Sequence, residues 1–158
     1  RSAMGHFAEA RAAFEATGAG RTRACAALLL NMGTCLYALG RREEALEMYN
    51  ESKDAFEAAG AVMSTGFGDL MRNTGACHAS MGRTLEAAQA YVKAKEVYEA
   101  IGKAFTSEYA GVLQEMGELY GSQGLHFESS SLYEIAKGTY ESLGAHRSPR
   151  YAGLLQNM

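Results

Sequence analysis

The chain has 158 residues, of which 47% are hydrophobic and 21% are charged, a composition typical of one folded domain. The net charge is −3, and basic and acidic residues are spread evenly along the chain, which argues against a nucleic-acid-binding or membrane-surface protein. No stretch is long and apolar enough for a membrane-spanning helix, and no signal-peptide pattern opens the chain. The three cysteines lack metal-ligand and CxxC spacing, which favours reduced thiols and a cytoplasmic location.

Hydrophobic residues at helical spacing predict a chain made of helices. Leu29, Met32, Gly33 and Leu36 form one stripe, and a second stripe starts at Ala45. No segment alternates with the period of two that a strand shows. In chain order the expected helices are Met4–Thr17, 23–39, 43–59, 65–81, 85–101, 107–123, 127–143 and Pro149–Met158.

Glycines and small polar residues mark the ends of these helices. Gly40 and Gly60 follow the stripes directly, where a helix often ends in a left-handed residue. Ser64, Thr106 or Ser107, and Ser148 stand where the next helices should begin and can cap them.

An internal repeat of 42 residues organises the whole chain. Three glycine series have this spacing: Gly18/Gly60/Gly102/Gly144, Gly33/Gly75/Gly117 and Gly40/Gly82/Gly124. Tyr49, Tyr91 and Tyr133 follow it too, and we expect them in the core. Gly33 lies inside a helix stripe, and its recurrence predicts a close approach between paired helices. We predict one repeat array: a partial repeat at 1–22, full repeats at 23–64, 65–106 and 107–148, and the start of another at 149–158.

The pattern of Leu29, Met32, Gly33 and Leu36, followed by Gly40, Ala45, Tyr49 and Ser52, resembles the tetratricopeptide signature. The 42-residue period is similar to that of kinesin light chains. The resemblance implies an all-α, right-handed superhelical solenoid of antiparallel helix pairs. It also implies that the first helix of each pair lines a concave groove for a protein partner.

The face of the first helices that points away from the stack is polar and rich in small residues. Asn can donate and accept hydrogen bonds together, which suits the unpaired backbone of an extended peptide. Small residues such as Gly111 would leave room for that peptide, and Arg72 could either pair with Asp69 or bind a carboxylate. The candidate peptide-binding residues are Asn31, Tyr37, Asp69, Arg72, Asn73, Gln114, Glu115, Glu118, Gln156 and Asn157.

We find no sequence pattern for catalysis, a cofactor or a metal site. The histidines have no HExxH spacing, and His78 is expected to be a partly buried, hydrogen-bonded residue. Lys53–Glu57, Lys95–Glu99 and Lys137–Glu141 have the spacing of helical ion pairs on the convex side.

The sequence therefore predicts a non-enzymatic adaptor that binds a peptide or helix in its groove, as kinesin light chain repeats do with cargo. One alternative is a regulatory or recruiting module of a larger enzyme. Another is a structural rod in a ciliary or transport assembly. The location is expected to be cytoplasmic, with a cytoskeletal or ciliary association as one option, and the oligomeric state is left open.

Overall fold

The computed structural model describes residues 5, 9, 12–14, 16, 18, 20 and 22–158 of the chain. Most of the expected helix Met4–Thr17, and most of the partial repeat 1–22, lies outside the described residues. All statements on the fold below concern the described part.

Seven helices follow one another between residues 23 and 157. They are α2 (Arg23–Ala38), α3 (Arg42–Ala58), α4 (Thr65–Ser80), α5 (Thr84–Ala100), α6 (Ser107–Ser122), α7 (His126–Ser142) and α8 (Pro149–Asn157). No strand occurs among the described residues. Each of these helices begins and ends within one residue of its predicted bounds.

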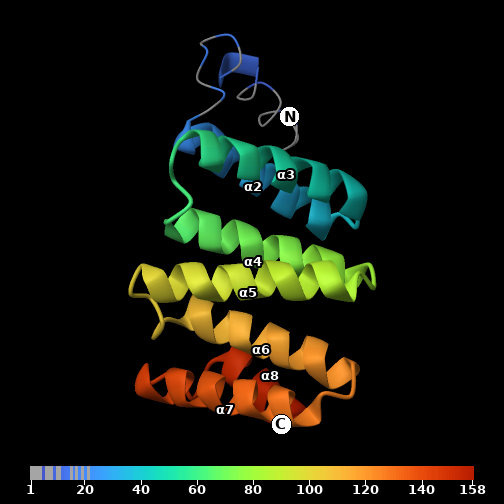
Figure 1. Cartoon of the computed structure of the whole chain (residues 1–158), viewed down its shortest axis with the longest axis vertical. Helices are drawn as coiled ribbons and strands as arrows, with labels where there is room; N and C mark the ends of the chain where they lie inside the picture. Colours follow the sequence, from blue (N-terminus) through green and yellow to red (C-terminus); the bar gives the residue numbers. More distant parts are fainter. Residues whose placement is uncertain are drawn as a thin grey trace.

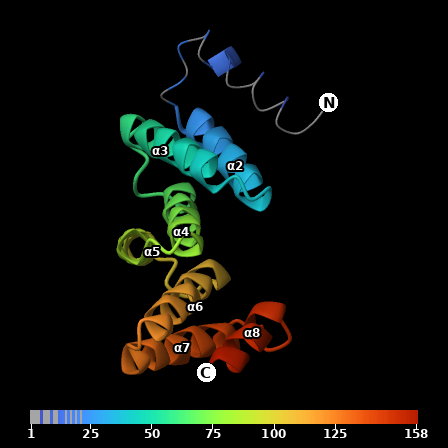
Figure 2. The same cartoon turned by 90° about the vertical axis from the view of Figure 1, so that its right-hand side faces the viewer.

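The helices form pairs that are stacked along one axis (Figure 1). The most extensive contacts lie within the pairs α2–α3, α4–α5 and α6–α7, and the second helix of each pair contacts the first helix of the next. The first helices also touch one another in the series α2–α4, α4–α6 and α6–α8. Turned by 90°, the view shows the pairs following one another down the stack, with α5 seen end-on beside α4 (Figure 2). The predicted all-α solenoid of antiparallel helix pairs is confirmed.

Hydroxyl caps begin the first helix of every pair. The side chains of Thr22, Ser64, Thr106 and Ser148 each accept a hydrogen bond from the backbone N–H three residues later. Such caps satisfy a backbone donor that the helix itself leaves unpaired. The predicted caps are thereby confirmed, with Thr106 rather than Ser107 at the start of α6.

Paired helices approach closely where a glycine faces a tyrosine ring. A Cβ atom built on Gly33 would lie 2.5 Å from Cε1 of Tyr49, and one on Gly117 would lie 2.5 Å from Cε1 of Tyr133. Both rings are buried. Only glycine fits here, so the close approach and the packed tyrosines are confirmed.

Two expectations about polar side chains are wrong. His78 is half-buried as expected, but its Nδ1 atom is buried and has no hydrogen-bond partner among the described residues. Of the three expected helical ion pairs, only Lys53–Glu57 and Lys95–Glu99 form. Glu141 accepts a hydrogen bond of 2.8 Å from the hydroxyl of Tyr151 instead, because α8 brings this ring against the end of α7.

Candidate peptide-binding groove

The predicted peptide-binding residues all lie on first helices. Asn31 and Tyr37 belong to α2, Asp69, Arg72 and Asn73 to α4, Gln114, Glu115 and Glu118 to α6, and Gln156 and Asn157 to α8. All of them are exposed or half-buried. Because α2, α4, α6 and α8 contact one another in series, the predicted residues lie along one row of helices.

An ion pair joins α4 to α6 in the middle of this face. Nε of Arg72 donates to Oε1 of Glu115 at 3.0 Å, and Nη2 of Arg72 donates to the same oxygen. The two side chains are only 17% and 25% exposed. Burial by itself lowers the pKa of Arg72, but the hydrogen bond and the charge of Glu115 outweigh it, so the pKa is raised and the guanidinium stays charged.

Asp69 does not pair with Arg72, although the sequence allowed that pairing. Its Oδ1 accepts a hydrogen bond from the hydroxyl of Tyr98 on α5. Burial and this hydrogen bond to a carboxylate raise the pKa of Tyr98. Asp69 therefore ties α4 to the second helix of its own pair, while Arg72 reaches the next pair.

Asparagine amides link successive first helices across the groove. Nδ2 of Asn73 donates to Oγ1 of Thr34 at 3.2 Å, and Nδ2 of Asn157 donates to Oε1 of Glu118 at 2.8 Å. The same Glu118 oxygen accepts a hydrogen bond of 3.2 Å from Nε2 of Gln114. Each of these asparagines thus links two successive first helices through one amide donor.

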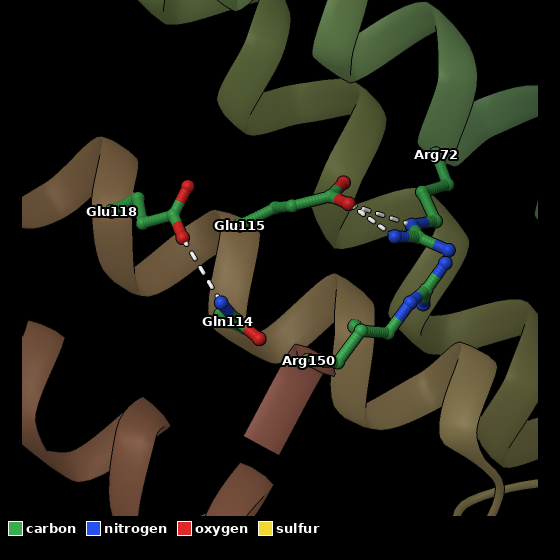
Figure 3. Close-up of a pocket in the computed structure, with 6 residues that line it drawn as sticks. Arg72, Gln114, Glu115, Glu118 and Arg150 are labelled. Atoms are coloured by element: carbon green, nitrogen blue, oxygen red, sulfur yellow. Dashed lines mark hydrogen bonds and ion pairs between the residues drawn. The ribbon is translucent and has the colours of Figure 1, made fainter. Parts of the chain in front are cut away.

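The groove contains a pocket of about 290 Å³ between α4, α6 and α8 (Figure 3). Its lining residues are Arg72, Gly111, Gln114, Glu115, Glu118 and Arg150. Glu118 lies at one end, and the two arginines lie together at the other (Figure 3). The pocket is therefore polar and carries opposite charges at its two ends.

The expectation that Gly111 leaves room for a peptide is wrong. A Cβ atom on Gly111 would lie 2.7 Å from Nη1 of Arg150 and 2.9 Å from Nη2 of Arg72. The space above this glycine is thus filled by two guanidinium groups of the chain itself. The space that a ligand could occupy is the pocket beside these guanidinium groups.

Arg150 is a pocket residue that sequence reasoning missed. It stands 78 positions after Arg72, in the first turn of α8, and it has no counterpart of the same type in the other repeats. Only the stacking of α8 on α6 brings its guanidinium next to that of Arg72. No pattern in the sequence could have indicated this meeting.

Among the described residues, no three His, Cys, Asp or Glu side chains gather as a metal site would require. No disulfide joins the three cysteines, all of which the structure describes, and Cys25 and Cys77 are buried. In the same part of the chain, every helix is too short or too polar to cross a bilayer.

Comparison with known proteins identifies the fold. No family model matches the chain, and no curated protein matches its sequence. Among solved structures, the chain is similar to BtubC (BKLC) from P. vanneervenii, with a TM-score of 0.80 and 15% sequence identity over 87% of this chain. The match covers 55% of BtubC, so this chain spans about half the length of that protein. The likeness shows an all-helical, tetratricopeptide-like repeat fold.

Proposed function

We propose that the chain is a non-catalytic scaffold or adaptor module that binds a partner's extended peptide or short helix in the groove of α2, α4, α6 and α8. The observation that carries this proposal is the row of contacting first helices, with a pocket of about 290 Å³ that is lined mostly by polar and charged side chains. The groove residues are the ten predicted ones, Asn31, Tyr37, Asp69, Arg72, Asn73, Gln114, Glu115, Glu118, Gln156 and Asn157, together with Arg150.

Exposed amides at the two ends of the groove suit a peptide backbone. Asn31 on α2 and Gln156 on α8 are both exposed and carry a donor and an acceptor each. Between these two helices, Asn73 on α4 donates one hydrogen bond to Thr34. A peptide along this line would meet polar partners over its length, and pocket residues would read its side chains.

The family and location remain part of the proposal. The fold likeness to BtubC supports a tetratricopeptide-like array of 42-residue units similar to those of kinesin light chains, divided at 22/23, 64/65, 106/107 and 148/149. We place the protein in the cytoplasm, with a protein partner that is cytoskeletal or ciliary as one option. A recruiting module of a larger enzyme, and a structural rod, are the competing functions.

The test is a selection of peptide ligands followed by mapping. The chain is used as bait for a display library of random 12-residue peptides, and a selected peptide is added to isotope-labelled protein. We expect amide NMR shifts to change on α2, α4, α6 and α8 and to stay unchanged on the outer faces of α3, α5 and α7.

Matched amide variants provide the control. Asn31→Ala and Gln156→Ala alter exposed groove amides, whereas Asn50→Ala alters an exposed amide on α3. The groove variants should weaken peptide binding several-fold, with Asn50→Ala neutral. Shifts confined to α3, α5 and α7, or no selectable peptide at all, would contradict the proposal and favour the rod.

A further inference from the structure

A second pocket, of about 450 Å³, lies between α3, α4 and α5. Its base on α4 is a stripe at helical spacing, made of Phe67, Met71, Thr74 and His78. On a helix with 3.6 residues per turn, this stripe lies about half a turn away from Asp69 and Asn73. The pocket is therefore on the other side of α4 from the proposed peptide groove.

The pocket is hollow because two of its side chains are shorter than their equivalents in the neighbouring pairs. Thr74 stands where α6 carries Met116, and Ala90 stands where α7 carries Leu132. The preceding pair has methionine at both positions. Long apolar side chains thus occupy, in the other pairs, the positions that α4 and α5 leave open.

The walls are apolar at the base and polar at one end. Phe67, Met71 and Ala90 are each no more than 9% exposed. Thr74 and His78 are half-buried and form the polar end. Oγ1 of Thr74 donates its proton to the backbone oxygen one turn earlier at 2.8 Å, so it can only accept a further hydrogen bond.

His78 offers one ring nitrogen to a ligand. Its Nδ1 atom is buried without a partner, so Nε2 is the nitrogen that a ligand can reach. Burial lowers the pKa of this side chain, so the ring is neutral at pH 7. A neutral imidazole carries its proton on either nitrogen, and a hydroxyl group, which both donates and accepts, matches both forms.

The lysines of the rim already have acidic partners. Lys53 on α3 forms an ion pair with Glu57, and Lys93 on α5 forms one with Glu96. Together with the apolar base and the neutral imidazole, these pairs favour an uncharged ligand over an anion.

We infer that this pocket binds a small uncharged phenol, whose ring lies on the apolar base and whose hydroxyl pairs with Nε2 of His78. The ring fills the space that Thr74 and Ala90 leave and contacts Met71, since a thioether packs favourably against an aromatic edge. The next helix pair carries a phenol of its own at this point, because Tyr120 stands at the position of His78. This ligand site is separate from the peptide groove and goes beyond the proposed adaptor function.

The test compares para-ethylphenol with its methyl ether, para-ethylanisole, on protein with isotope-labelled methionine methyl groups. We expect the NMR signal of Met71 to shift with millimolar phenol and the signal of Met116, in the next pair, to stay unchanged. The hydroxyl donates a hydrogen bond, to Nε2 of His78 or to Oγ1 of Thr74, that the ether cannot donate. The ether should therefore bind about tenfold more weakly.

Two variants separate the space from the polar group. Thr74→Met combined with Ala90→Leu fills the pocket with the side chains of the next pair and should abolish the shift of Met71. His78→Leu keeps the space and should weaken binding of the phenol several-fold while binding of the ether stays unchanged. Because His78→Leu carries the test by itself, the outcome does not depend on the folding of the filled variant.

The inference would be overturned by the absence of a Met71 shift, by binding that persists in the filled variant, or by equal effects of His78→Leu on phenol and ether. The groove variants Asn31→Ala and Gln156→Ala should leave phenol binding unchanged, since they lie on α2 and α8 outside this pocket. Weaker phenol binding in these two variants would place the phenol in the groove and would also overturn the inference.

Discussion

Gly75 sits in the middle of α4, where glycine weakens a helix by about 1 kcal/mol relative to alanine. The ring of Tyr91 explains its presence. A Cβ atom on Gly75 would lie 2.7 Å from Cδ1 of this ring, which is 3% exposed. A ring packed on all sides cannot give way, so the close approach of α4 and α5 depends on the missing side chain.

The variant Gly75→Ala should therefore lower the free energy of unfolding by about 1 kcal/mol or more, because overpacking outweighs the gain in helix propensity. Gly138→Ala is the matched control, since Gly138 is exposed within α7 and a Cβ there meets nothing within 4 Å. The free energy of unfolding of Gly138→Ala should rise by up to about 1 kcal/mol. Urea unfolding measures both, and a stabilised Gly75→Ala would contradict the packing argument.

His78 is a half-buried residue whose Nδ1 atom is buried, at a position where the other pairs carry a leucine or a tyrosine. The equivalent residues are Leu36 and Tyr120. Burial lowers the pKa of His78, with Glu86 and Glu43 acting in the opposite direction and Arg83 in the same one. Because the unfolded chain takes up this proton at a higher pH, His78 costs stability as the pH falls through about 6.5.

His78→Leu should stabilise the protein by about 1 kcal/mol at neutral pH, since it removes the unpaired Nδ1 atom and keeps apolar contacts. This gain in stability should grow as the pH falls from 7 to 5, because His78 in the folded protein resists protonation. Thermal unfolding of both proteins across this range measures the difference. A gain that shrinks toward acid pH would mean that His78 finds a partner when charged.

At the scale of elements, the sequence predicted the helices far better than the contacts between them. Helix ends followed from local chemistry, as with the Thr106 cap and the glycine after each stripe, so the bounds were right to one residue. The row of contacting first helices followed from the repeat period. The partner of Arg72 could not be predicted in this way, because two carboxylates were chemically suitable. These were Asp69, three residues before Arg72, and Glu115 on the next helix pair.

The Arg72–Glu115 pair should couple α4 to α6 by about 1 kcal/mol or more. Its side chains are mostly buried, so screening by water is weak and loss of either partner leaves a desolvated charge. A double-mutant cycle with Arg72→Met and Glu115→Gln, followed by urea unfolding, measures the coupling. The pair Lys53–Glu57, at 3.8 Å and about half exposed, should give only a few tenths of a kcal/mol. Equal coupling in the two cycles would show that burial does not strengthen the first.

At the scale of the whole molecule, stability is distributed along a line. In the described part of the chain, each helix contacts only helices of its own pair and of the adjacent pairs, and α2 and α3 have no contact with α6, α7 or α8. In such an array, stability is a sum of unit and nearest-neighbour terms. A destabilising substitution in one helix pair should therefore affect that pair and its neighbours and leave the distant pairs unchanged.

Leu113→Ala tests this directly, because Leu113 is fully buried in α6 and its truncation costs about 2–5 kcal/mol. Hydrogen exchange should accelerate in α6 and α7 and in the adjoining α5 and α8, while α2 and α3 keep their protection. Leu29→Ala, at the equivalent position of α2, should give the mirror-image pattern. Since a single cooperative core would lose protection in all helices together, equal acceleration from α2 to α8 would contradict the linear array and, with it, the treatment of each groove segment as an independent unit.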